Sequence, residues 1–373
     1  MEAAGIARKW VIWILIADQL MFIAMDLALG VAADRVVSGM RRLGPWIAGI
    51  SVVSCLAFLL MPFTPGLGNG APALLLGAIV LWSLTSSALR APIIALLGKH
   101  ASPSAATWLT NLALLGVGVA GALAPVLTVK LRGLDPRLPF VLAGAGLLIA
   151  VVAMGWAERR LDAHANASPV VLVAPNGQLG VAFFVAIALL CAGFQVHTSI
   201  NSAPIFLRFA APPMLVWLLA FFWIGFSLVI VPSAWLINRF GAATVLAIGA
   251  VLGAASLAAM DGAPNLALLT TLQTFCGAGW APVIAGGISV AIAAGRSGRE
   301  GRTSGRVFAL LAAGAALRLT LVATELHKMP ETADLLLSLP ALFWSVAAVL
   351  CIIWLRGGGR PFGRRGMPLA ASH

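Results

Sequence analysis

Long apolar stretches alternate with short polar connectors along the whole chain. A helix needs about 20 mostly apolar residues to cross a bilayer, and eleven stretches reach that length. We expect membrane-spanning helices near residues 10–33, 45–63, 72–97, 105–129, 139–157, 179–205, 213–237, 242–260, 264–294, 304–325 and 336–356. The first stretch carries Asp18 and Asp26, which a cleavable signal peptide would lack, so we expect it to remain in the protein.

The composition is that of a membrane protein. Of the 373 residues, 61% are hydrophobic and 10% are charged, whereas about 25% of residues are charged in an ordinary soluble domain. The 24 Lys and Arg residues outnumber the 12 Asp and Glu residues, but they lie mostly in the connectors, so we expect no nucleic acid partner. The pattern predicts an all-α polytopic membrane protein.

No enzyme motif accompanies these stretches. The four cysteines lie singly inside apolar stretches, without the spacing of metal ligands. The sequence contains no G-x-S-x-G turn and no phosphate-binding loop, and the connectors are too short for a soluble catalytic domain. We therefore expect no enzymatic activity, no metal site and no cofactor.

The Lys and Arg residues predict the orientation of the helices. Most of them lie in the C-terminal tail and in the connectors after the first, third, fifth, seventh and ninth stretches. Because cytoplasmic connectors are enriched in these residues, we expect the C-terminus in the cytoplasm and, with eleven spans, the N-terminus outside. The expected location is a bacterial cytoplasmic membrane, with anionic lipid as a partner of the basic connectors.

The connector after the first stretch carries a pattern of its own. Its sequence, LGVAADRVVSGMRR, resembles the signature loop of the major facilitator superfamily, which joins the second and third of twelve helices. The matching residues are Gly30, Asp34, Arg35, Arg41 and Arg42. A degenerate copy, WLINRFG, closes the seventh stretch, with Arg239 in the place of Arg35 and Asn238 in the place of Asp34. A copy in each half is typical of duplicated transporter architectures.

The resemblance implies a major-facilitator-like bundle of two halves with about 11 transmembrane helices, in which the family's first helix has no counterpart. The expected parts are an N-terminal half-bundle of five helices at 1–157, a cytoplasmic connector at 158–178, a C-terminal half-bundle of six helices at 179–356 and a basic cytoplasmic tail at 357–373. Looser similarities relate the chain to the glycoside/pentoside/hexuronide symporter and sugar porter branches.

In the superfamily, the signature loop latches the two halves in one of the alternating states, and the resemblance implies this role here. The residues themselves offer a physical reason. Asp34 lies just past the end of an apolar stretch, where it can face the positive N-terminal dipole of a neighbouring helix. The alternative is a positively charged stop at the cytoplasmic surface that has no conformational role.

A polar run, QVHTSIN, interrupts the sixth stretch. Gln195, Thr198 and Asn201 match the spacing of the sugar porters' Q-x-x-S-x-x-N motif. Together with His197 they form a polar surface inside a span, where amide and hydroxyl groups suit a polyol. Two alternatives remain. His197 carries a proton, or the polar residues only form hydrogen bonds between helices. We expect Trp280 beside the same cavity.

Four charged residues lie inside apolar stretches, namely Asp18, Asp26, Arg90 and Arg318. Each is expected to have a partner, because an unpaired ion at the helix centre costs roughly 2.5 to 3.5 kcal/mol on the insertion scale. Matching depths would pair Asp18 with Arg318 across the halves and Asp26 with Arg90 within the first half. The pair across the halves would be either a gate, in which Asp18 takes a proton, or a static bridge.

These features predict a secondary active transporter that moves a small organic solute by rocking of its halves and is coupled to a proton or sodium ion. The alternative is a facilitator-like protein that no longer transports and acts in membrane assembly or sensing. The absent counterpart of the first helix keeps this alternative open. An upstream reading frame with about 20 more apolar residues would remove the objection.

Overall fold

The computed structural model describes residues 1–39, 44–100, 102–162, 179–295 and 299–356. All regular secondary structure in this part of the chain is helical, which confirms the predicted all-α fold. Among the described residues, nine apolar segments are long enough to cross a membrane. One of them, Ile47–Ser87, includes parts of two predicted spans, and the span near 139–157 contributes a shorter apolar helix, Leu138–Ala153.

The N-terminal part of the chain forms five long helices. They are α1 (Arg8–Gly39), α2 (Gly44–Leu60), α3 (Ala71–His100), α4 (Pro103–Leu134) and α5 (Leu138–Asp162). A short 3-10 helix, η1 (Glu2–Ala4), precedes them, and a longer one, η2 (Met61–Gly70), joins α2 to α3. Local sequence sets these boundaries. Ser102 caps α4 by accepting a hydrogen bond from the Ala105 N–H, and Gly68 in η2 has a left-handed φ of 63°.

The C-terminal part contains the remaining helices. They are α6 (Val181–Val196), α7 (Ser202–Leu207), α8 (Leu215–Leu218), α9 (Ala220–Phe240), α10 (Ala242–Met260), α11 (Leu266–Gly295), α12 (Glu300–Ala323) and α13 (Pro330–Arg356). A π-helical turn, His197–Asn201, joins α6 to α7, so the sixth predicted span is not one regular helix. Gly241, with φ 90°, ends α9 at the degenerate copy of the signature loop.

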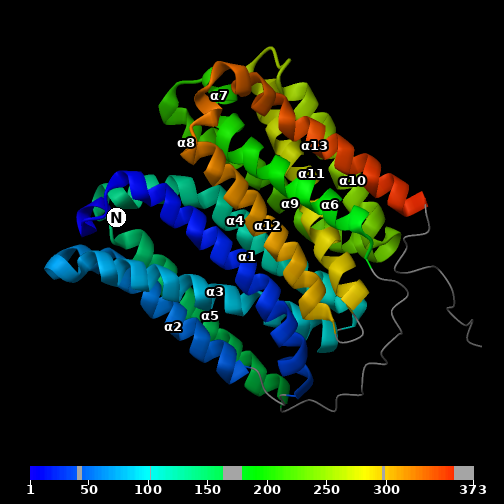
Figure 1. Ribbon diagram of the computed structural model, residues 1–373. Helices are drawn as coiled ribbons and strands as arrows, with labels where there is room; N and C mark the ends of the chain where they lie inside the picture. The colour runs from blue at the N-terminus through cyan, green and yellow to red at the C-terminus, as the bar shows by residue number, and fades with distance from the viewer. Residues whose placement is uncertain (40–43, 101, 163–178, 296–298, 357–373) are drawn as a thin grey trace, which may run out of the picture.

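Figure 1 shows α6 and α9 to α13 gathered in one bundle, with α1, α2, α3 and α5 in a second group beside it. Within the apolar window of α11, 89% of the residues are buried, against 6% for the corresponding window of α4. Helix α11 is therefore the centre of the C-terminal bundle, whereas α4 presents its apolar side chains outward. Such exposed apolar surface is what a helix in contact with lipid requires.

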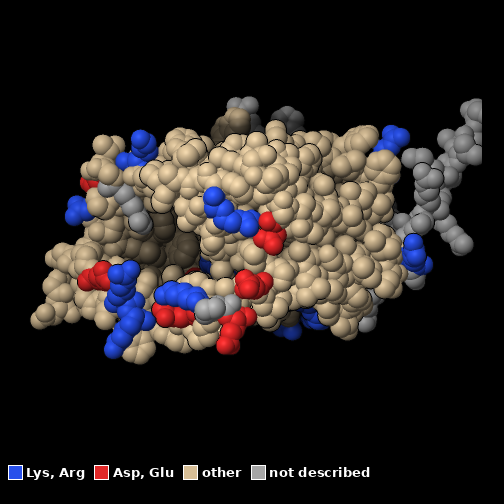
Figure 2. All heavy atoms as spheres, turned by 90° about the horizontal axis from the view of Figure 1, so that it is seen from above, with Lys and Arg blue, Asp and Glu red and all other residues tan. Residues whose placement is uncertain are grey.

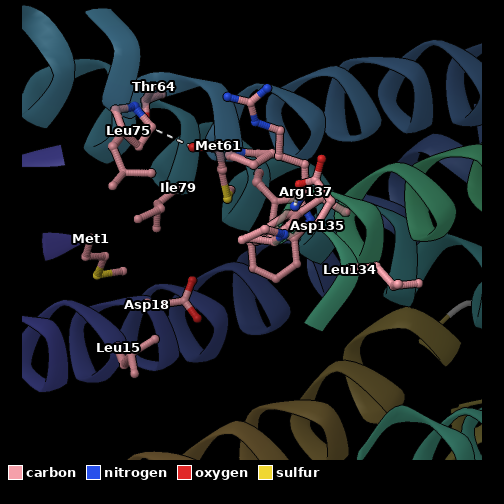
Figure 3. Close-up of a pocket in the computed structure, with 15 residues that line it drawn as sticks. Met1, Leu15, Asp18, Met61, Thr64, Leu75, Ile79, Leu134, Asp135 and Arg137 are labelled. Atoms are coloured by element: carbon pink, nitrogen blue, oxygen red, sulfur yellow. Dashed lines mark hydrogen bonds between the residues drawn. The ribbon is translucent and has the colours of Figure 1, made fainter. Parts of the chain in front are cut away.

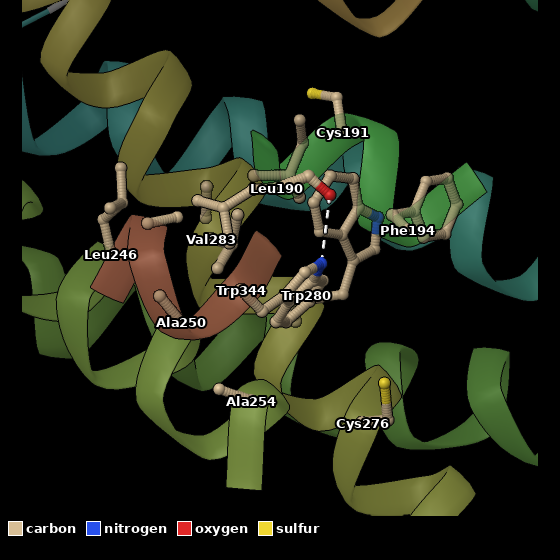
Figure 4. Packing of buried hydrophobic residues seen from close by; sticks show 14 of the residues in the cluster. Leu190, Cys191, Phe194, Leu246, Ala250, Ala254, Cys276, Trp280, Val283 and Trp344 are labelled. Carbon is tan, nitrogen blue, oxygen red and sulfur yellow. Dashed lines mark hydrogen bonds between the residues drawn. The ribbon is translucent and has the colours of Figure 1, made fainter. Parts of the chain in front are cut away.

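Small residues bring the helices of the C-terminal bundle together. A Cβ atom added at Gly249 in α10 would lie 2.6 Å from the carbonyl oxygen of Gly279 in α11. Glycines permit this approach because association in lipid depends on close packing rather than on removal of apolar surface from water. Next to this contact lies a cluster of large buried side chains that includes Trp280 and Trp344 (Figure 4).

The chain passes back and forth between two ends of the bundle. We call the end that holds Asp34 the Asp34 end, and the end that holds Met1 the Met1 end. Helix α5 extends to Asp162, beyond the predicted end near 157. Most of the predicted connector, 163–178, and the tail, 357–373, lie outside the described residues.

Candidate functional site

At the Asp34 end, the carboxylate of Asp34 lies on the N-terminus of α12. It accepts hydrogen bonds from the backbone N–H groups of Gly301 at 2.6 Å and Arg302 at 3.1 Å. These donors belong to the first turn of the helix, which has no partners for them within the helix. The dipole of α12 adds a favourable interaction with the negative charge. This geometry confirms the expected approach of Asp34 to a helix N-terminus.

Three glycines allow α1 and α12 to touch through their backbones next to Asp34. A Cβ atom added at Gly30 would lie 2.5 Å from the carbonyl oxygen of Gly301. One added at Gly305 would collide with the carbonyl oxygen of Asp26. Helices α1 and α12 lie side by side (Figure 1), so the contact at these glycines joins the N-terminal and C-terminal parts of the chain.

Gly301 and Gly305 were not among the predicted site residues. Their four-residue spacing in EGRTSGRV is the small-xxx-small pattern that favours close helix pairs in membranes, and this signal could have identified them. Arg41 and Arg42 of the predicted latch lie outside the described residues. Arg35 is exposed at the end of the same helix.

The second copy of the loop also contacts the start of a helix, but through side chains only. The side-chain amide of Asn238, at the end of α9, donates to the hydroxyl of Ser104 at 3.2 Å, at the start of α4. Further along these two helices, the buried amide of Asn111 donates to the carbonyl of Ile230 at 2.8 Å. Arg239 lies over the ring of Trp235 at 5.5 Å. Hydrogen bonds thus join α9 to α4 near Asn238, as they join α1 to α12 near Asp34.

At the Met1 end, a cavity of about 820 Å³ opens within the N-terminal half. Its walls come from α1, η2, α3 and the turn between α4 and α5 (Figure 3). Asp18 lies in its wall, and Arg137 lies opposite, on the side of the turn. Figure 2 shows a deep hollow in the face seen from above, on the side where Figure 1 places the N-terminus.

The predicted pair of Asp18 and Arg318 is not formed. The carboxylate of Asp18 accepts hydrogen bonds from the Gln19 amide at 3.0 Å and from the hydroxyl of Ser83 on α3. Arg318 instead donates from Nη1 to the hydroxyl of Ser199 at 3.0 Å. The prediction was wrong because each charge turns toward a hydroxyl group of its own half, although α1 and α12 are neighbours as expected.

Asp26 is completely buried in α1. Its predicted partner, Arg90, belongs to α3, but the side chain of Arg90 lies outside the described part of the structure. The pairing of Asp26 with Arg90 therefore stays a prediction.

The π-helical turn divides the polar run into two sets of side chains. His197 and Asn201 turn into the C-terminal bundle, where both are buried. The His197 Nε2 atom lies 2.9 Å from the Gln273 Oε1 atom on α11, and the Gln273 amide donates to Ser202 at 3.3 Å. Asn201 donates to the carbonyl of Leu336 at 2.7 Å. In this conformation, hydrogen bonding between helices accounts for these residues, as the alternative reading had it.

The other set of side chains is accessible. Gln195 and Thr198 are half-buried, and Ser199 is exposed. The hydroxyl of Thr198 donates to the Phe194 carbonyl at 2.8 Å, whereas the hydroxyl of Ser199 accepts a hydrogen bond from the guanidinium group of Arg318. The extra residue of a π-turn rotates the following side chains relative to a regular helix, and such turns are frequent at functional sites. Sequence reasoning passed over Ser199 because the sugar porter spacing does not include it.

Trp280 lies in the core of the C-terminal bundle rather than beside a cavity. Its ring is 3% exposed and stacks on Phe194, with ring centroids 4.4 Å apart and an interplanar angle of 5°. Trp344 packs against its other side at 5.7 Å and donates its indole N–H to the Leu190 carbonyl (Figure 4). Its bulk and apolar neighbours make Trp280 a packing residue of α11.

Across the described ranges, no three His, Cys, Asp or Glu side chains lie close enough to hold a metal ion together. All four cysteines are buried and unpaired by disulfides. The polar groups that do come together are carboxylates, hydroxyls, amides and one guanidinium, which can bind a solute or a proton without a cofactor.

No family model and no curated protein matches the sequence. Solved structures match the fold. One is FucP, a major facilitator superfamily transporter in the outward conformation, with 16% identity, a TM-score of 0.59 and coverage of 91% of this chain and 89% of that chain. A bacterial homologue of the iron transporter ferroportin, in an outward-facing state, has 14% identity, a TM-score of 0.64 and coverage of 92% and 89%. The chain therefore has the fold of the major facilitator superfamily transporters.

Proposed function

We propose that this protein is a secondary active transporter that moves a small organic solute across a membrane by alternating access. The observation that carries the proposal is the contact of Asp34 with the N-terminus of α12. It joins the two parts of the chain at one end through two hydrogen bonds and close contacts of glycine backbone. Such a contact can break and re-form as a unit, which a gate between two rocking halves requires.

The Asp34 end is the cytoplasmic end in this proposal, with the C-terminus on the same side. The concentration of Lys and Arg in the connectors at this end supports the assignment. The protein would then be a multi-pass protein of a bacterial cytoplasmic membrane, and its structure would be a state closed to the cytoplasm. The hollow at the Met1 end fits such a state, and the related structures are of outward conformations.

A coupling ion enters the proposal through Asp18. This carboxylate is 7% exposed and lies in the wall of the cavity at the Met1 end. Its hydrogen-bond partners, Gln19 and Ser83, are neutral, so no charge compensates it through these contacts. A carboxylate in such a place is a natural site for a proton or a sodium ion. One related structure is of a fucose:proton symporter, which makes a proton the first ion to test.

The deciding experiment is solute uptake by purified protein in liposomes. A thermal-shift screen of sugars, amino acids, organic acids and cations would first select ligands, because a ligand that binds only the folded protein raises its melting temperature. We expect at least one selected solute to show saturable uptake that a proton or sodium gradient drives. Ligands that bind but are never taken up would favour the alternative, a facilitator-like protein in membrane assembly or sensing.

A further inference from the structure

Arg318 is a cation inside a membrane-spanning helix that has no acidic partner in the described part of the chain. It lies five residues before the end of α12 at Ala323, or about 8 Å at 1.5 Å per residue. Among the described residues, no carboxylate oxygen lies within 4.0 Å of its guanidinium group. Its Nε atom is buried without a hydrogen-bond acceptor. A cation at this depth needs an anion or water to compensate it.

The neighbouring hydroxyl is arranged to share an acceptor with Arg318. Ser199 accepts a hydrogen bond from Nη1 of Arg318 at 3.0 Å, so its own O–H remains free to donate. Ser199 is exposed because the π-helical turn aims it away from the buried residues His197 and Asn201. The guanidinium group and the hydroxyl group thus present donors to the same accessible space.

A guanidinium group turned to hydrocarbon would be strongly destabilising, so the site that these donors would form has to face water. Gln195 lies four residues before Ser199 on the same helix and is half-buried, so its amide is available to the polar body of a bound molecule. Arginine binds carboxylate and phosphate groups with two parallel hydrogen bonds, and serine adds a third donor.

We propose that Arg318 and Ser199 form an anion-binding site, and that the transported solute is a small organic acid with a carboxylate or phosphate group. This inference rests on the proposed transport function and goes beyond it, since it assigns the charge of the solute. It also replaces the partner that sequence reasoning gave to Arg318: the anion comes with the solute and not from Asp18.

The test compares acids with neutral molecules of similar shape. The probes are lactate with lactamide, gluconate with sorbitol, and glycerol 3-phosphate with glycerol, each titrated against the purified wild-type protein at constant ionic strength. We expect the acidic member of at least one pair to bind at least about tenfold tighter, the effect of one charged hydrogen bond. The pair that responds distinguishes a carboxylate from a phosphate. Equal or tighter binding of the neutral members would overturn the proposal.

Variants then locate the site. Arg318→Gln should weaken binding of the acid at least about tenfold, Arg318→Lys less, and Ser199→Ala about threefold. Arg208→Gln is the matched control, because Arg208 forms an exposed ion pair with Asp261 at the surface. Size-exclusion profiles and melting temperatures of the unliganded variants show whether each is folded. If Arg318→Gln fails to fold, Arg318→Lys and Ser199→Ala decide. Unchanged affinity in folded variants would overturn the proposal.

Uptake measurements separate this inference from the proposed function. Acids that bind through Arg318 but are not taken up into liposomes would leave the anion site intact and contradict the transport function. Uptake of neutral solutes that Arg318→Gln leaves unchanged would support transport and overturn the anion site.

Discussion

At the scale of single residues, Asp34 gives the sharpest test, since its carboxylate makes two charge-assisted hydrogen bonds with α12. Asp34→Ala should remove about 1 kcal/mol from the free energy that closes the Asp34 end, since an acid at a helix N-terminus contributes roughly 0.3 to 1 kcal/mol and up to about 2 kcal/mol when partly buried. Uptake should therefore slow several-fold while the amount of folded protein stays the same. The uptake rate of Asp34→Asn should lie between those of the wild type and Asp34→Ala, because an amide oxygen still accepts a hydrogen bond from one N–H group.

Asp261→Ala is the control for this change, because Asp261 is an exposed acid whose ion pair lies at the Met1 end. Uptake by Asp261→Ala should equal that of the wild type. If Asp34→Ala transports at the wild-type rate, the loop is only a charged stop at the membrane surface, and the latch role predicted for Asp34 is wrong.

Two glutamines separate structural from binding residues in the polar run. Gln273 is buried and bonds His197 at 2.9 Å, so Gln273→Leu leaves the His197 Nε2 atom with only the longer contact of 3.4 Å to the Ser202 hydroxyl, a loss of about 1 kcal/mol. The melting temperature should fall by several degrees with little change in the apparent KM. Gln195→Leu, at a half-buried position, should raise the apparent KM with little change in melting temperature. The reverse outcome would show that the buried network, and not the accessible set, contacts the solute.

Composition alone could not have assigned these two sets. Gln195, His197, Thr198 and Asn201 are all polar, and a regular helix would place them on one broad surface. The π-helical turn changes their directions by one extra residue, and nothing in the sequence pattern marks where that residue is inserted. The sequence therefore showed which residues of the span are polar, but not where their side chains point.

At the scale of helices, the close approach of α1 and α12 predicts the effect of a single methyl group. A Cβ atom at Gly305 would collide with the backbone of Asp26, and backbone cannot move aside as a flexible side chain can. Gly305→Ala should therefore hold the Asp34 end open and reduce uptake at least tenfold. A cysteine introduced at Ala33, which packs against Gly301, should become more reactive toward a water-soluble thiol reagent.

Gly116→Ala is the matched control in α4, because a Cβ atom there meets nothing within 4 Å. It should leave uptake unchanged and add helix stability of up to about 1 kcal/mol. Equal loss of uptake in both variants would mean that glycine flexibility matters rather than the contact of α1 with α12.

At the scale of the whole molecule, the hydrophobic pattern predicted the helices well and their contacts poorly. A span must satisfy its backbone internally and be about 20 residues long, so length and composition reveal it. A helix such as α11 is apolar on every side, and no stripe of polar residues tells which side meets a neighbour. The depths of Asp18 and Arg318 were close, but the directions of their side chains depend on Ser83 and Ser199, which only the folded bundle brings near.

Asp18 is the residue through which the proposed transport cycle is coupled to an ion. If Asp18 carries a proton when the cavity at the Met1 end is open, the carboxylate must be charged and neutral in different states of the cycle. Asp18→Asn keeps the shape and the hydrogen bond with Ser83 but cannot change its charge. We therefore expect this variant to exchange solute across liposomes at a rate near that of the wild type, while accumulation driven by a pH gradient is lost.

Asp135→Asn supplies the control, since Asp135 lies in the same cavity but on the exposed turn between α4 and α5. It should retain both exchange and accumulation. Loss of folded protein in Asp18→Asn alone would identify Asp18 as a static acceptor for Ser83 and Gln19. Accumulation that survives in folded Asp18→Asn would remove the carboxylate from the coupling step. In that case, the charge that crosses the membrane would have to be that of the solute itself. An anionic solute bound at Arg318 would carry such a charge.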